Sequence, residues 1–168
     1  MRRDSVVAIV GALNENQVRY LIVGGLAVVA HGYLRFTADV DLLLSVDSDN
    51  LKRTVGALKT LGYRPRAPVD FDDFVDRSNR QKWAQEKNMT VFSLFSDIHP
   101  ATEIDLFLEP PIDFDGAYRR AVRQEVAPGT PAVFCSLEDL IELKTLSGRP
   151  EDREDIEKLK QLRKSSDE

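Results

Sequence analysis

The first third of the chain alternates between segments of helical periodicity and short apolar runs. Apolar residues between positions 6 and 13 repeat at helical spacing after Ser5, which we expect to cap this helix. Residues 19–23, RYLIV, are typical of a short buried strand. Gly24-Gly25 turns this strand into a second helix, which we place at 26–34, LAVVAHGYL. The pattern therefore predicts a helix, a strand and a helix in order.

A second strand and a third helix follow. Residues 38–46, ADVDLLLSV, predict a strand, and Asp47 to Asp49 supply capping residues for a helix that ends at Gly62. The polar segment 64–88 has no period that predicts an element.

Order resumes with MTVFSLF at 89–95 and TEIDLFLEP at 102–110, which together predict a β-hairpin. We expect a short helix over 116–126 and a short strand over 131–136. LEDLIELKTL at 137–146 and EDREDIEKLKQLRK at 151–164 predict a helical pair.

Strands cluster in the first two thirds of the chain and helices in the last third. This order suggests the α+β class. We expect an α+β core over residues 1–135, with a C-terminal helical pair over 136–168 packed on it as part of one compact unit. Gly148-Arg149-Pro150 separates the two helices with a C-terminal glycine and a proline that begins the next helix.

Composition is that of an ordinary globular protein. The 168 residues are 42% hydrophobic and 30% charged, with a formal net charge of −5, which argues against a protein that coats nucleic acid. No apolar run reaches about 18 residues, so we predict no membrane span and a cytoplasmic location. Arginine and lysine cluster locally, as in RPRAP at 64–68, so a basic wall beside an acidic site is compatible with the sequence.

Few residues are available for soft metals or disulfides. Cys135 is the single cysteine, and the two histidines, His31 and His99, lie far apart in sequence. These counts exclude an internal disulfide and argue against a zinc site. Any bound metal should therefore have oxygen ligands, which favours Mg²⁺ or Mn²⁺.

Two aspartates share one face of the second predicted strand. Asp39 and Asp41 are two residues apart, so their side chains point the same way, while Val40 and Leu42 point to the opposite, apolar face. A pair of this kind also occurs on the outer face of half-exposed sheets without any function. Asp105 favours the functional interpretation over the structural one, because it lies in a similar apolar segment, IDLFL, which resembles VDLLL around Asp41.

Three neighbouring carboxylates need a proton or a cation. Two like charges at 4 Å repel by about 4 kcal/mol at an effective dielectric constant near 20. Protonation would require strongly raised pKa values, whereas one or two divalent ions would relieve the repulsion and would also serve phosphoryl chemistry. We favour a metal site formed by Asp39, Asp41 and Asp105.

The glycine pair before this strand suggests a phosphate site. Gly24 and Gly25 allow phosphates to approach the backbone at the start of a helix. The alternative is that the glycines only permit close packing of the strand and the helix. Their position directly before the D-x-D strand favours a role in binding.

These residues together resemble a known family. GGLAVVAHGYLRFTADVDLLL resembles the signature of the nucleotidyltransferase superfamily that includes DNA polymerase β, in which a glycine pair, D-x-D and a third carboxylate on a later strand recur. The variant is most similar to abortive-infection type toxin nucleotidyltransferases and their small relatives. The family usually has Gly-Ser at the turn, and here Gly25 replaces the serine, which leaves backbone contacts only.

The resemblance implies an α+β nucleotidyltransferase-like fold, with a mixed sheet flanked by helices and a C-terminal helical segment. It implies transfer of NMP from a nucleoside triphosphate such as ATP, with Mg²⁺ or Mn²⁺ held by the three aspartates and Asp105 as a general base. The segment 136–159 is similar to a lysine followed by R-x-x-D-x-x-D in those relatives, which adds Lys144 to the catalytic residues. The implied nucleotide-binding residues are Gly24, Gly25, Arg35, Thr37, Lys144 and Asp155.

The helical pattern places Lys144 on a face where an apolar residue is expected. It falls on the apolar face of its helix, where a buried ammonium needs a partner, and Asp152 or Asp155 is placed to supply one. This pair is either structural or functional. Arg35 and Thr37 likewise either support the strand or contact phosphate.

Several functional alternatives remain open at this stage. The acceptor is an RNA end, a partner protein or a small molecule, and the resemblance suggests a toxin–antitoxin or phage-defence setting with a cognate toxin or antitoxin. A different class is a partner-binding protein of the same fold with little or no catalysis. A metal-dependent phosphohydrolase is disfavoured because no histidine accompanies the carboxylates. We expect His31 to be a packing residue, and Phe71, Phe74 and Trp83 to form a hydrophobic cluster under a loop rather than an acceptor wall.

Overall fold

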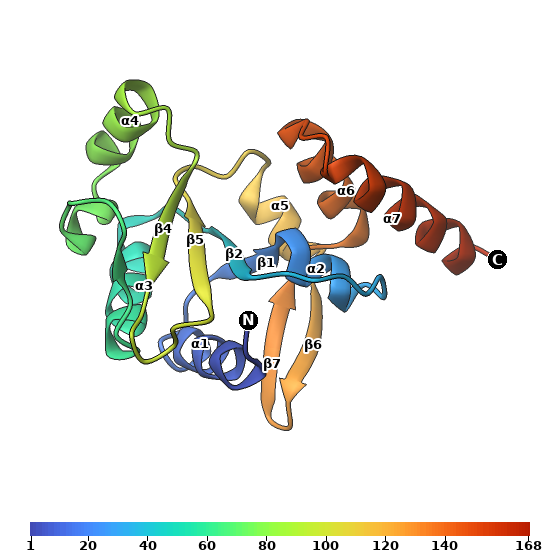
Figure 1. Cartoon of the computed structure of the whole chain (residues 1–168), viewed down its shortest axis with the longest axis horizontal. Coiled ribbons are helices and arrows are strands. Elements are labelled where there is room, and N and C mark those ends of the chain that lie inside the picture. The colour runs from blue at the N-terminus through green and yellow to red at the C-terminus, as the bar shows by residue number, and fades with distance from the viewer.

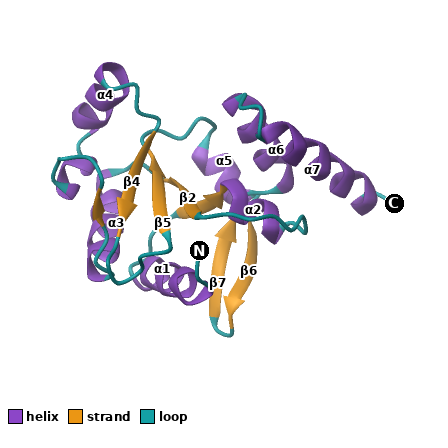
Figure 2. Cartoon of the chain, in the orientation of Figure 1, coloured by secondary structure: helices purple, strands orange, loops and turns teal.

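A mixed sheet of seven strands crosses the molecule and carries helices around it (Figure 1, Figure 2). The computed structural model describes all residues from Met1 to Glu168. The elements are α1 (Arg3–Glu15), β1 (Tyr20–Val23), α2 (Gly24–Ala30), β2 (Asp39–Leu44), α3 (Ser48–Thr60), β3 (Arg64–Pro65), the 3-10 helix η1 (Phe71–Val75), α4 (Arg77–Glu86), β4 (Val91–Phe95), β5 (Glu103–Phe107), α5 (Phe114–Arg119), β6 (Val122–Ala127), β7 (Thr130–Phe134), α6 (Leu137–Ser147) and α7 (Asp152–Ser166).

The strand order is β3-β4-β5-β2-β1-β7-β6. β2 pairs antiparallel with β1 and parallel with β5, and β4 and β5 form the antiparallel hairpin that the sequence predicts. β1 lies inside the sheet, between β2 and β7, and all four of its residues are buried, which explains its uninterrupted apolar run. The predicted α+β class with a mixed sheet flanked by helices is confirmed.

One hydrophobic cluster joins the helices to the sheet. Residues from α1, α3, α6 and α7 all contribute buried side chains to it, and α6 packs against both α7 and α2. Figure 1 shows α6 and α7 together at one side of the molecule, with α4 at the other side. None of the helices is both long and apolar enough to cross a lipid bilayer.

Helix caps explain several element boundaries. Asp47 caps α3 by accepting a hydrogen bond from the backbone N–H of Asn50, as expected, and Ser136 caps α6 in the same way. The predicted Ser5 cap is wrong, because α1 begins at Arg3, which leaves Ser5 inside the helix. The buried hydroxyl of Ser5 is hydrogen-bonded to the ring of His99 instead.

Two other predicted helices differ from the structure. The helix expected at 26–34 begins at Gly24 and ends at Ala30, because Gly32 has a positive φ of 111° and takes the chain away from the helix axis. The helix expected at 116–126 is a short α5 followed by β6. β6 forms because its backbone pairs with β7 across a tight turn at Gly129, a tertiary interaction that overrides helical propensity.

The segment 64–88 closes one end of the sheet. Phe71, Phe74 and Trp83 surround the ring of Phe92 at centroid distances of 6.1, 5.1 and 5.0 Å and belong to the main core. They therefore form a hydrophobic cluster, as predicted, but it is continuous with the main core rather than a satellite cluster under a loop. Arg80 is the charged residue of this region that the sequence left unexplained, and it is almost fully buried.

Candidate active site

The predicted carboxylates meet on neighbouring strands. β2 and β5 run parallel in a register that places Asp41 beside Asp105 and Asp39 beside Glu103. Val40 and Leu42 lie on the opposite face with 0% exposure, as the alternation predicts. The predicted neighbourhood of Asp39, Asp41 and Asp105 is therefore present in the backbone register.

A fourth acidic residue joins this face. Glu103, next to Asp39, forms an ion pair with Arg66, which lies beyond the edge strand β3. Glu103 was not among the predicted site residues, whereas Arg66 belongs to the RPRAP cluster that was considered as a basic wall beside an acidic site. The alternation of EIDLF contained a signal for Glu103, since it stands two residues before Asp105 and points the same way.

Burial and mutual repulsion change how the carboxylates ionise. Burial, followed by the charges of Asp105 and Asp39, raises the pKa of Asp41 from 3.8 to about 7, although Arg149 and Lys144 oppose the change. Burial and the charges of Asp105 and Glu103 also raise the pKa of Asp39. The negative charge of this site is therefore relieved either by a proton on Asp41 or by a bound cation.

The donor set suits a hard divalent ion. Carboxylate oxygens are the ligands that Mg²⁺ and Mn²⁺ prefer. The side chains are not gathered into a ready-made metal cage anywhere in the chain. Ionised carboxylates repel one another, so a divalent ion on this face would both draw the aspartate oxygens together and neutralise them.

Gly24 and Gly25 stand directly against this face. A Cβ atom on Gly24, whose φ is +67°, would lie 2.0 Å from Oδ2 of Asp41, so no other residue fits there without displacing the carboxylate. A Cβ on Gly25 would lie 2.6 Å from the hydroxyl of Thr37. The glycines therefore leave the backbone bare at the point where Asp41 and Thr37 converge.

A buried network of charges joins α6 to α7. The Nζ atom of Lys144 lies 3.0 Å from Asp152 and 2.9 Å from Asp155, and its side chain is 7% exposed. Both predicted partners therefore contact the ammonium. The charge of Lys144 also lowers the pKa of Asp41, though less than burial and the neighbouring carboxylates raise it.

Two arginines extend this network towards solvent. Arg35 pairs with Asp155, and Nε of Arg149 lies 3.2 Å from Asp152. Burial alone would raise the pKa of Asp152, but hydrogen bonds from Lys144 and Ser147 outweigh it and hold the pKa below its usual value. The network thus keeps Asp152 ionised, in contrast to Asp41.

Among the remaining predicted residues, His31 has a structural contact. Its Nε2 atom is 2.8 Å from the carbonyl oxygen of Cys135, which links α2 to the segment before α6. This contact agrees with a packing role. Cys135 is buried, and burial raises the pKa of its thiol to about 12, so it is not a reactive nucleophile.

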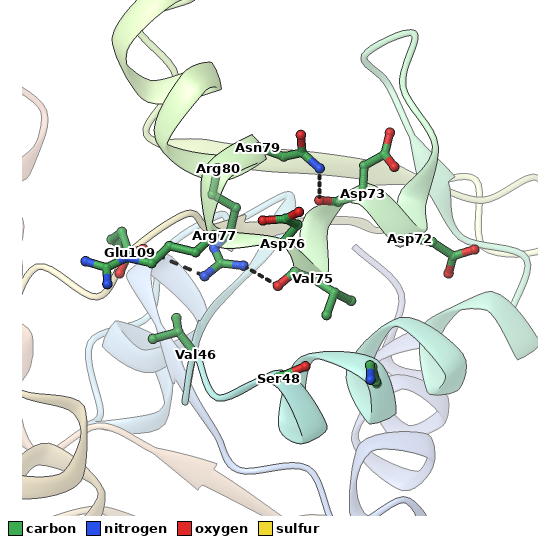
Figure 3. Close-up of a pocket in the computed structure, with 11 residues that line it drawn as sticks. Val46, Ser48, Asp72, Asp73, Val75, Asp76, Arg77, Asn79, Arg80 and Glu109 are labelled. Carbon is green, nitrogen blue, oxygen red and sulfur yellow. Dashed lines mark hydrogen bonds and ion pairs between the residues drawn. The ribbon is translucent and has the colours of Figure 1, made fainter.

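A separate cleft of about 1050 Å³ lies between the start of α3, η1 and α4 (Figure 3). None of the predicted site residues lines it. Arg80 forms part of its wall, and its guanidinium donates to the carbonyl oxygens of Phe74, Val75 and Leu108 at 2.7, 2.9 and 3.2 Å. Arg80 therefore ties η1 to the end of β5 and is committed to structure.

Comparisons with known proteins bear on the fold. No protein-family model matches the chain, and no curated protein matches it significantly. The solution structure of the antibiotic-resistance factor ANT(2'')-Ia is similar at a TM-score of 0.59 and 16% identity, covering 97% of this chain and 89% of that chain. The crystal structure of ANT(2'')-Ia in complex with adenylyl-2''-tobramycin gives a TM-score of 0.53 and 16% identity, covering 97% and 95%. The chain therefore has a nucleotidyltransferase-like α+β fold.

Proposed function

We propose that the protein is a metal-dependent nucleotidyltransferase that moves NMP from a nucleoside triphosphate to an acceptor hydroxyl. The observation that carries this proposal is the contact between a bare glycine backbone at Gly24 and Asp41, with Asp105 adjacent to Asp41 on the next strand. ANT(2'')-Ia shares the fold and has been seen with a nucleotidylated aminoglycoside, which supports the same reaction class.

The triphosphate side of the site is built from Gly24, Gly25 and the Lys144 network. Bare backbone N–H groups at the glycines would donate to phosphate oxygens. An ammonium group has three donors; Asp152 accepts a hydrogen bond from Lys144 and Asp155 forms an ion pair with it, so a donor would remain for a phosphate oxygen. Thr37 is held against Gly25 and would line the same cradle.

Asp39, Asp41 and Asp105 would hold the divalent ion, Mg²⁺ or Mn²⁺. When bound, this ion would neutralise triphosphate charge and stabilise the leaving pyrophosphate. Asp105 would accept the proton of the attacking hydroxyl, because it lies on the side of Asp41 that faces away from the glycines.

The acceptor belongs to one of three classes under this proposal: an RNA end, a protein or a small molecule. The pairing of Arg66 with Glu103 places a cation beside the carboxylate face, so both charged and neutral acceptors find complementary groups there.

A second candidate function is binding of a partner protein, such as a cognate toxin or antitoxin. Leu34 and Phe36 favour it, because their side chains are 82% and 83% exposed on the segment that leads to Asp39. Large apolar side chains so close together at a surface often mark an interaction site. Aspartate variants that still bind a recovered partner would support this alternative.

Calorimetry tests the main proposal. We expect at least one of the four common NTPs to bind in the presence of Mg²⁺, and binding to weaken in Asp41→Asn. Absence of binding by all four NTPs, or unchanged nucleotide transfer in Asp41→Asn, would overturn the proposal. Asp167→Asn is a matched control, since Asp167 is an exposed aspartate after α7.

A further inference from the structure

A row of paired residues on β1, β2, β5 and β4 connects the glycine turn to the carboxylates and beyond them. Val23, which precedes Gly24, lies beside Asp41, Asp41 lies beside Asp105, and Asp105 lies beside Ser93 of β4. Neighbouring strands are about 4.8 Å apart, so these positions follow one another at that spacing. The proposed triphosphate cradle stands at one end of the row and a serine at the other.

The hydroxyl of Ser93 is already engaged by the proposed general base. Its Oγ atom donates a hydrogen bond to Oδ1 of Asp105 at 2.6 Å. A catalytic base must lie within hydrogen-bonding reach of the proton that it accepts, and this distance meets the requirement. Ser93 is half-buried and belongs to a paired strand, so the hydroxyl is fixed relative to Asp105 yet open to the same face.

The order of these positions, from the glycines through the carboxylates to Ser93, matches the order of groups in a nucleotide transfer. The leaving pyrophosphate would lie over the glycines, the carboxylates would lie under the reacting phosphorus, and an acceptor hydroxyl would be required beyond Asp105. Ser93 supplies a hydroxyl at that end. In-line displacement needs the attacking and leaving oxygens on opposite sides of the phosphorus, and the strand register places Ser93 and the glycines on opposite sides of Asp41 and Asp105.

We propose that Ser93 is a site of self-nucleotidylation, in which the chain transfers NMP from an NTP to its own serine. Oγ of Ser93 forms a bond to the α-phosphorus, the bond from that phosphorus to the oxygen bridging the α- and β-phosphates breaks, and pyrophosphate leaves with the bond electrons. The proton of the hydroxyl passes to Asp105. The product is a phosphodiester between Ser93 and the nucleoside. This inference rests on the proposed function.

Modification of Ser93 would occupy the acceptor end of the site. The bulky nucleotide would stand beside Asp105 and would exclude an external acceptor, and Ser93 would no longer donate to the carboxylate. Self-nucleotidylation would therefore limit the enzyme's own activity on other acceptors.

Mass spectrometry of the full-length protein tests this proposal. After incubation with Mg²⁺ and each of the four NTPs, we expect a mass increase of one NMP, located on Ser93 by fragmentation. Ser93→Ala should lose the adduct, and Ser93→Thr, which keeps a hydroxyl on the strand, should retain it. Ser45→Ala is the matched control, because Ser45 also donates to an aspartate, Asp47, at 2.8 Å. The labelled fraction at a given time should not depend on protein concentration, since donor and acceptor sites belong to one chain.

Separate outcomes overturn the self-modification and the proposed function. An adduct that persists in Ser93→Ala, or transfer to an external acceptor with no adduct on wild-type protein, would refute the role of Ser93 while leaving the nucleotidyltransferase intact. Absence of both NTP binding and pyrophosphate release in wild-type protein would refute the proposed function itself.

Discussion

Replacing Asp41 with asparagine should stabilise the metal-free protein at alkaline pH while abolishing transfer. The raised pKa of Asp41, about 7 against an ordinary 3.8, means that the fold prefers the neutral carboxyl. One pKa unit corresponds to about 1.4 kcal/mol, so keeping Asp41 ionised above pH 7 costs the fold up to about 4 kcal/mol. Asparagine is neutral at every pH and avoids this cost.

The sign of the pH dependence follows from proton uptake. Between about pH 4 and pH 7 the folded state holds a proton on Asp41 that the unfolded chain has released, so this residue's contribution to stability falls as pH rises through that window. The stability difference between Asp41→Asn and wild type should be small near pH 4 and largest near pH 8.

Urea denaturation with a metal chelator at both pH values measures this difference. Asp167→Asn should change the free energy of unfolding by less than about 0.5 kcal/mol at either pH, as an exposed substitution. Added Mg²⁺ should stabilise wild type at pH 8 and stabilise Asp41→Asn much less. An asparagine variant with no gain at pH 8 would show that burial and neighbouring carboxylates do not strain Asp41, and the electrostatic argument for a cation would fail.

Three further substitutions probe the surrounding structure. Gly24→Ala should lose NTP binding, because its new Cβ would meet Asp41. Gly129→Ala is the control: alanine at either positive φ should cost about 1–2 kcal/mol of stability, but only Gly24 faces Asp41, so Gly129→Ala should keep NTP binding. Equal binding by the two variants in calorimetry would contradict the proposed phosphate cradle. Lys144→Met should lower the free energy of unfolding by about 3 kcal/mol or more, since it leaves two buried aspartates without their ammonium, while Lys59→Met, from an exposed pair, should cost less than about 1 kcal/mol in the same denaturation assay. Arg80→Met should cost about 2 kcal/mol or more by leaving buried carbonyls unpaired, and a variant as stable as wild type would refute its structural role.

Local chemistry made part of this site predictable. The spacing of Asp39 and Asp41 places them on one strand face whatever the fold, and the glycine pair marks the turn before them. Lys144 was predictable as a buried cation because it interrupts an apolar helix face, and both expected aspartates do contact it.

Strand register and loop conformation were beyond what periodicity can decide. The adjacency of Asp105 to Ser93 depends on the hairpin register, which arises from turn geometry and core packing. The β6 strand was mistaken for helix because its pairing with β7 is tertiary. The polar segment containing Arg80 shows neither helical nor strand periodicity. Arg80 is held there by hydrogen bonds to backbone carbonyls that come together only in the folded chain.

The proposed function requires that the carboxylate face formed by β2 and β5 transfers a nucleotide rather than a phosphate. Parallel incubations with Mg²⁺ and NTP labelled at either the α- or the γ-phosphate test it directly, with total RNA, candidate proteins and small molecules as acceptors and Asp41→Asn as the inactive reference. We expect covalent label from the α-phosphate only, release of the γ-label as pyrophosphate, and neither in the variant. Covalent transfer of the γ-label, or no transfer of either label to any acceptor or to the chain itself, would contradict it.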